Sequence, residues 1–184
     1  MPSSEGPFLS VDGPSGVGKT TTVRALAELL RDEGRVVHVT AEPSEGPIGK
    51  LARELTETMH GMTLACLYAA DRYHHLTSEV LPHMNAGEVV ITDRYIPSAL
   101  VMQQLDGVDP DYLWRINVRA SRPNLAVILD ADPTVVAQRL QDKGRTTGSR
   151  NYLHRPTSSG ITTGRLCPGP RQVAYRGVGT RRSG

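Results

Sequence analysis

The chain has 184 residues, of which 38% are hydrophobic and 22% charged, and these values are those of one globular domain. It has no run of about 18 apolar residues and begins without a basic segment followed by an apolar one, which argues against a membrane span and a secretory leader. The net charge is only +2, and the two cysteines, Cys66 and Cys167, are too few for a disulfide framework or a structural zinc site. We therefore expect a cytoplasmic protein.

Strand and helix patterns alternate along the first 143 residues. Short apolar runs predict strands, and apolar residues at helical spacing predict helices. Alternation of this kind indicates parallel strands joined by right-handed crossovers, and the continuous apolar runs indicate that both faces of the sheet are covered. We therefore expect an α/β fold with three layers, α/β/α, around a parallel sheet of which four strands are recognisable in the sequence. The predicted strands are 8–11, 36–40, 89–92 and 125–129, and the predicted helices are 20–33, 48–59, 64–81, 112–120 and one from 133.

The last part of the chain has a different composition. Residues 144–184 contain eight arginines and no Asp, Glu or Lys, whereas acidic residues outnumber basic ones before them. This segment is rich in Gly, Ser, Thr and Pro and poor in large apolar residues, which predicts a poorly ordered tail over 145–184 after a core over 1–144. No apolar strand is evident in it. Its only aromatic residues are Tyr152 and Tyr175, so nucleic acid is not the partner we expect.

A glycine-rich loop stands between the first predicted strand and the first predicted helix. It matches G-x-x-x-x-G-K-[ST], the Walker A pattern, with Lys19 and Thr20 as its last residues. Glycines let successive backbone N–H groups point into one concavity, and the helix N-terminus adds partial positive charge. The alternative, a chance match in a turn, does not account for the position between strand and helix. The loop predicts ATP binding by Gly13, Pro14, Ser15, Gly16, Val17, Gly18, Lys19, Thr20 and Thr21.

An aspartate follows the third predicted strand. Asp93 occupies the place of a Walker B carboxylate, and Mg²⁺ prefers a few hard oxygen ligands and water. The Thr20 hydroxyl and the Asp93 carboxylate are therefore the predicted magnesium ligands. The alternative is that Asp93 only caps the next segment, which the adjacent Arg94 makes less attractive.

Three further motifs carry a resemblance to a known family. Thr40-Ala41-Glu42-Pro43 is similar to T-R-E-P, residues 67–72 (Leu-Tyr-Ala-Ala-Asp-Arg) are similar to L-[FY]-A-A-D-R, and residues 93–98 (Asp-Arg-Tyr-Ile-Pro-Ser) are similar to D-R-Y-x-x-S. With the Walker A loop, and in this order and spacing, they resemble the thymidylate kinases, a group of P-loop nucleoside monophosphate kinases. The resemblance extends over residues 8–144. It implies the P-loop NTPase fold and transfer of the γ-phosphoryl group of ATP to dTMP, giving dTDP.

The resemblance also implies roles for individual residues. Tyr68 would stack on the thymine ring, Arg72 would donate to a base carbonyl, and Arg94 would hold the acceptor phosphate. The alternatives are a core role for Tyr68 and an exposed, paired charge for Arg72. Lys19, Arg94 and a lid arginine, Arg150, are the expected catalytic residues, and homodimers are expected from the family. The expected nucleoside monophosphate site comprises Asp12, Glu42, Pro43, Tyr68, Arg72, Arg94 and Ser98.

The sequence also departs from the family pattern. Ala41 replaces the arginine of T-R-E-P, Ser15 replaces a charged loop residue, and Ala99 and Met102 replace a polar residue and a tyrosine. After residue 144 there is no pattern for the family's remaining helix, strand and helix, which suggests truncation or a change of reading frame. Two alternatives to a dTMP kinase therefore remain open. One is a kinase for another nucleoside monophosphate, and the other is a catalytically impaired nucleotide-binding protein.

Overall fold

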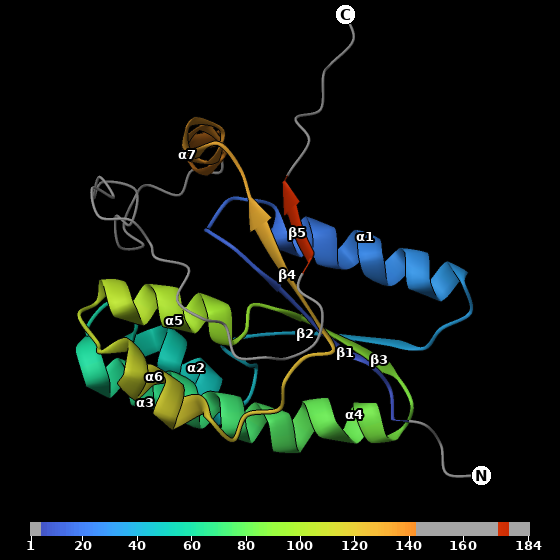
Figure 1. The fold of residues 1–184 in the computed structure, drawn as a ribbon, viewed down its shortest axis with the longest axis horizontal. Coiled ribbons are helices and arrows are strands. Elements are labelled where there is room, and N and C mark those ends of the chain that lie inside the picture. The colour runs from blue at the N-terminus through green and yellow to red at the C-terminus, as the bar shows by residue number, and fades with distance from the viewer. Residues whose placement is uncertain (1–4, 143–172, 177–184) are drawn as a thin grey trace, which may run out of the picture.

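One parallel sheet of five strands, in the order β2-β3-β1-β4-β5, forms the centre of the computed structural model, which describes residues 5–142 and 173–176 (Figure 1). The central strand β1 pairs with β3 on one side and β4 on the other, so the segment that follows β1 leaves from the middle of the sheet. The strands are β1 (Phe8–Asp12), β2 (Val37–Ala41), β3 (Val89–Asp93), β4 (Leu125–Asp130) and β5 (Val173–Arg176).

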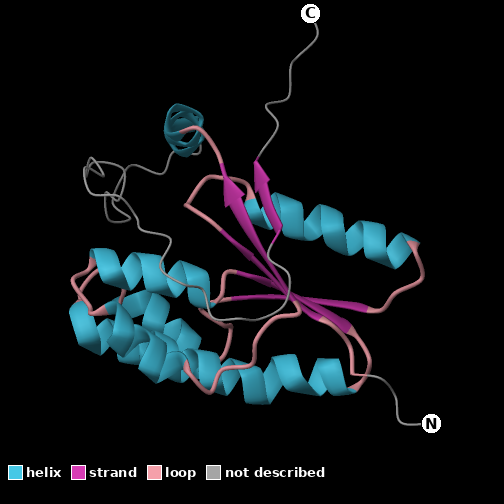
Figure 2. Ribbon diagram, viewed as in Figure 1, coloured by secondary structure: helices cyan, strands magenta, loops and turns pink. Residues whose placement is uncertain are grey.

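Helices cover both faces of the sheet, which confirms the expected three layers (Figure 2). The third helix continues through a π-helical segment, η1, into the fourth, so the predicted helix over 64–81 is longer at both ends. None of the helices in the described ranges is long and apolar enough to cross a membrane. The helical elements are α1 (Lys19–Asp32), α2 (Pro47–Leu55), α3 (Gly61–His75), η1 (Leu76–Val80), α4 (Leu81–Asn85), α5 (Ile96–Leu105), α6 (Pro110–Asn117) and α7 (Pro133–Asp142).

The core lies on both sides of the sheet because successive residues of a strand point to opposite faces. On β3, Val89 and Ile91 belong to the cluster that contains Val23 and Ala27 of α1. Val90, between them, belongs to the cluster on the other face, which η1 and α4 supply with Leu76, Val80 and Met84. The continuous apolar run in β3 therefore reflects burial on both faces, as the sequence indicated.

The structure differs from the expected elements in two places. Helix α5 was not expected, because its buried residues include Ser98 and Gln103 and no apolar stripe marks its inner face. Strand β5 was not evident in the sequence, and the structure adds it to the four recognisable strands, because residues 173–176 pair in parallel with Val127–Asp130 of β4. Four residues between Gln172 and Gly177 are too few for a pattern, and the partner strand lies more than 40 residues away in sequence. The remainder of the predicted tail, and with it Arg150, lies outside the described residues.

Candidate active site

The glycine-rich loop forms an open cradle at the N-terminus of α1. Gly13, Gly16 and Gly18 have φ values of 137°, 81° and 112°, which residues with a side chain rarely adopt. At Gly13 a Cβ atom would also lie 2.4 Å from the Leu129 carbonyl oxygen at the end of β4. No side chain caps the N-terminus of α1. Its free N–H groups and the loop amides therefore remain available to an anion.

Lys19 is the first residue of α1, and its side chain folds back over the loop. The residue is 6% exposed, and Nζ donates to the carbonyl oxygens of Gly13 at 3.0 Å and Pro14 at 2.7 Å. Burial, together with the positive charge of Arg94, lowers the pKa of Lys19 to about 8, although Asp93 and Asp12 oppose this change. The ammonium group is thus held at the loop by two neutral acceptors that a phosphate oxygen would outcompete.

Thr20 and Asp93 meet beside this loop, as the sequence indicated. The Thr20 hydroxyl donates to Oδ2 of Asp93 at 2.6 Å, and both groups line a cleft of about 290 Å³. Register explains their proximity, because Asp93 ends β3 opposite Val11 of β1, two residues before the loop begins at Gly13. Two hard oxygens at the edge of a solvent-filled cleft suit Mg²⁺, which binds through one or two protein ligands and keeps its waters.

Arg94 occupies an unusual backbone conformation. Its φ is 76°, and it is the one non-glycine residue with positive φ among those the structure describes. Its guanidinium lies over the glycine-rich loop, with NH2 3.2 Å from the Ser15 hydroxyl oxygen and NH1 3.5 Å from the Gly13 carbonyl oxygen. A left-handed backbone conformation is costly at a residue with a long side chain, and it persists only where the surrounding structure imposes it. The turn after β3 thus places a second cation next to Lys19.

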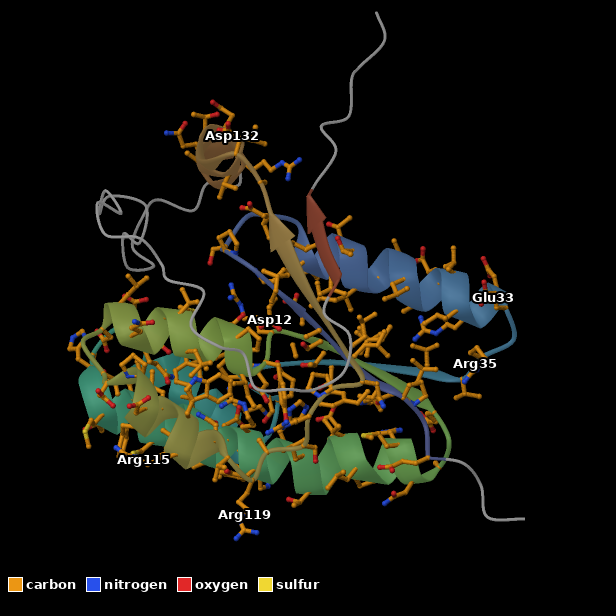
Figure 3. All side chains as sticks on the ribbon, viewed as in Figure 1. Asp12, Glu33, Arg35, Arg115, Arg119 and Asp132 are labelled. Carbon is orange, nitrogen blue, oxygen red and sulfur yellow. The ribbon has the colours of Figure 1, made fainter. Side chains whose placement is uncertain are left out.

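Asp12 imposes that turn. Its Oδ1 accepts hydrogen bonds from the backbone N–H groups of Tyr95 at 2.9 Å and Ser98 at 3.1 Å and from the Ser98 hydroxyl at 2.6 Å. The Ser10 hydroxyl donates to Oδ2 at 3.0 Å. Figure 3 shows Asp12 inside the molecule, whereas the labelled Glu33, Arg35 and Arg119 lie at its periphery. Asp12 and Ser98, both expected at the acceptor site, are thus buried and hydrogen-bonded to each other, and Asp12 also fixes Tyr95, the residue after Arg94.

Arg72 lies in a buried ion pair rather than on an exposed helix face. Its Nε and NH2 donate to Oε2 of Glu42 at 3.0 and 2.7 Å, and NH1 donates to Oδ1 of Asn117. The guanidinium also lies 5.4 Å from the centre of the Tyr95 ring. The side chains of Arg72 and Glu42 are 1% and 4% exposed. The fork of Arg72 is therefore fixed in direction, which suits recognition of a planar group.

The two remaining residues of the expected acceptor site lie on neighbouring elements. Tyr68, half-buried on α3, bonds through its hydroxyl to Oγ1 of Thr56 at the end of α2, at 3.0 Å. The Pro43 carbonyl accepts from NH2 of Arg53 at 2.6 Å. Tyr68 lies one helical turn before Arg72, so both belong to the same side of α3.

Sequence reasoning missed two residues of this region. Asn117 gave no signal, since it is one polar residue in α6, and only the fold brings it to Arg72. Arg53 of α2 also lines the cleft and pairs with Glu45 at 2.5 Å. Arg53 comes from α2, but it lines the same cleft as Ala41, the last residue of β2, which replaces an arginine of the family pattern.

Comparisons with known proteins agree on one family. The family model for thymidylate kinase matches residues 11–155. A probable thymidylate kinase of Caldivirga maquilingensis is 38% identical over 141 residues, covering 74% of this chain and 69% of the relative. One of Pyrobaculum calidifontis is 39% identical over 143 residues, covering 75% and 71%. A thymidylate kinase of Geobacillus thermodenitrificans is 39% identical over 146 residues, covering 74% and 64%.

Proposed function

Because this chain belongs to the thymidylate kinase family, a group of ATP-dependent dTMP kinases that form dTDP, we propose how its own residues carry out that reaction. The observation that carries the proposal is the convergence of three features within one site. The open glycine-rich cradle, the Lys19 and Arg94 cations, and the Thr20–Asp93 pair lie together at the carboxyl end of the central strands. Phosphoryl transfer needs this combination of positioning and charge neutralisation.

The cradle is the proposed ATP site. Its residues are the loop from Gly13 to Thr20, with Thr21 next on α1. The loop N–H groups bind the phosphates, and Lys19 exchanges the carbonyl oxygens of Gly13 and Pro14 for oxygens of the β- and γ-phosphates. Arg150, in the segment outside the described residues, is the proposed lid arginine.

Magnesium is the proposed metal of the reaction, and Thr20 and Asp93 would hold it. Their oxygens fit this ion, as the hydrogen bond between them and their place in the cleft indicate. When bound, the ion neutralises the phosphate charge that develops during transfer.

The acceptor is proposed to bind between α3 and the turn after β3. Arg94 holds the monophosphate close to the cradle, and Arg72, oriented by Glu42 and Asn117, donates to the base through its two remaining N–H groups. Tyr68 supplies the aromatic face for stacking, and Pro43 follows Glu42 at the edge of this site. Asp12 and Ser98 act by holding the Arg94 turn. A general base is unnecessary because the acceptor phosphate is already ionised.

We further propose that the active form is a homodimer working in the cytoplasm, where ATP is supplied. Large apolar side chains on the outside of neighbouring helices support the dimer. Met62 of α3, Val101 of α5 and Trp114 of α6 are 54%, 56% and 40% exposed. Light scattering after gel filtration tests this proposal, and a monomeric mass at assay concentration would contradict it.

A coupled assay for ADP release tests the reaction and the role of the cradle. The enzyme receives ATP and Mg²⁺ with dTMP, dUMP, UMP, CMP or no acceptor. We expect turnover that depends on dTMP and falls at least about tenfold in Lys19→Ala, because a cation at the transferring phosphate is lost. Lys50→Ala, at an exposed position of α2, is the matched control. Turnover with another acceptor but not with dTMP would contradict dTMP as the substrate. Full activity of Lys19→Ala would contradict the role of Lys19.

A further inference from the structure

A second group of chemically active side chains lies at the opposite end of the sheet from the cradle. His38 is the second residue of β2, His83 belongs to α4, and Glu88 immediately precedes β3. His38 and Glu88 thus lie at the amino ends of β2 and β3, whereas the cradle follows the carboxyl end of β1. The described part of the chain contains no other group of three or more His, Cys, Asp or Glu side chains with the geometry to hold a metal ion.

The three side chains of this cluster place their ligand atoms close enough together to share one ion. One ligand atom from each of His38, His83 and Glu88 lies within 4.8 Å of the other two. The two imidazole rings stack, with their centres 3.6 Å apart and their planes 10° from parallel. Nδ1 of His83 lies 2.8 Å from Oε2 of Glu88. All three side chains are half-buried, so an ion could reach them from solvent and still be partly shielded.

A fourth side chain holds His38 in place. Oε1 of Glu79, in the π-helical segment η1, lies 2.9 Å from Nε2 of His38. A carboxylate that faces one ring nitrogen is the usual outer partner of a metal-binding histidine, because it fixes the orientation of the ring.

The donor set determines the kind of ion. Two imidazole nitrogens and one carboxylate oxygen suit zinc and neighbouring first-row dications, whereas Mg²⁺ and Ca²⁺ prefer sites made of oxygen alone. We propose that His38, His83 and Glu88 form a binding site for a zinc-class dication, with water as a further ligand, which ties the edge strand β2 to α4 and to the start of β3. This site is separate from the magnesium pair of the proposed reaction.

The test is a titration of the full chain. Affinity tags and nucleotide are removed first, and bound metal is then removed with a chelator. Zn²⁺ alone is titrated by calorimetry, and Co²⁺ is used as a visible probe of tetrahedral coordination. We expect one Zn²⁺ site per chain whose affinity falls at least about tenfold in His83→Ala, with loss of the Co²⁺ absorption bands, because a ligand is removed. Glu79→Gln should also weaken binding, by about tenfold or more, through the orientation of His38.

Three controls make the result decisive. His60→Ala removes a histidine before α3, outside the cluster, and should leave Zn²⁺ affinity unchanged. Asp93→Asn alters the magnesium pair and should also leave it unchanged. If circular dichroism shows that His83→Ala is unfolded, His83→Gln, which keeps a hydrogen-bonding amide, replaces it. Failure of the wild-type chain to bind Zn²⁺, equal affinity of the folded His83 variant, or loss of binding in Asp93→Asn would overturn the proposal.

Discussion

The charge of Lys19 depends on its burial in the glycine-rich loop. With a pKa of about 8, Lys19 is protonated at neutral pH and loses its charge as the pH rises through 8. A bound polyanion favours the protonated form, so ATP binding above pH 8 requires uptake of a proton. The same burial that aims the ammonium at the phosphates thus makes ATP affinity sensitive to mild alkali.

We therefore expect ATP affinity to be nearly constant from pH 7 to 7.5 and to fall as the pH rises through 8, approaching about tenfold per pH unit. Calorimetric titration of ATP from pH 7 to 9.5 measures this slope. Lys50→Ala should keep the slope, and Lys19→Ala should bind weakly at every pH with a flat profile. A flat profile in the wild-type protein would contradict the link to Lys19.

The buried pair of Arg72 and Glu42 should be far more important for stability than the exposed pair of Arg53 and Glu45. In Glu42→Ala the Arg72 guanidinium remains buried without a counter-charge, and we expect a loss of about 3–5 kcal/mol in the free energy of unfolding. Glu45 is 82% exposed, so Glu45→Ala should change it by less than about 1 kcal/mol. Urea denaturation of both variants measures the difference, and equal losses would contradict this view of Arg72.

At the scale of elements, α2 depends on one close contact with the loop after β2. A Cβ atom on Gly49 would lie 2.0 Å from the Ser44 carbonyl oxygen. Alanine normally stabilises a helix by about 1 kcal/mol relative to glycine. Here we expect the opposite effect. Gly49→Ala should lower the free energy of unfolding by about 1–3 kcal/mol, because the backbone must move to make room for the Cβ atom. Thermal or urea unfolding checks this, with Lys50→Ala as the neighbouring control, and a stabilised Gly49→Ala would refute it.

Elements with strong local patterns were predictable, and those defined by distant partners were not. β1 and β3 were correctly predicted because an apolar run ends at an aspartate in each strand. The glycine-rich loop was recognisable because it matches a defined sequence pattern. α5 lacked an apolar stripe, and β5 is four residues paired with β4 from far away in sequence. The site follows the same division. The structure brings Thr20 and Asp93 together, and their role as magnesium ligands stays a prediction. Asn117 reaches Arg72 only through the packing of α6, which has no signature in the sequence.

For the molecule as a whole, nucleotide binding should raise thermal stability. At an ATP concentration of about 100 times Kd, ligand binding adds about 2.7 kcal/mol to the free energy of unfolding. For a chain of this size that corresponds to an increase of about 5–10 °C in Tm. Differential scanning fluorimetry with ATP and Mg²⁺ measures the shift. Lys19→Ala should lose most of it at the same ATP concentration, whereas Lys50→Ala should retain it, and equal shifts in both variants would contradict an ATP site in the cradle.

The position of β1 in the sheet also has a consequence for how the chain is synthesised. β1 emerges from the ribosome before both of its sheet partners, because Phe8 pairs with Val90 of β3 and Leu9 pairs with Leu125 of β4. Before β3 is made, both edges of the nascent β1 are unpaired. Once β3 has paired, the edge that will face β4 is still unpaired. Closing such long-range parallel pairs is slow, and the intermediates expose strand edges. The strand that leads into the nucleotide-binding loop is therefore synthesised before the two strands that hold it in place.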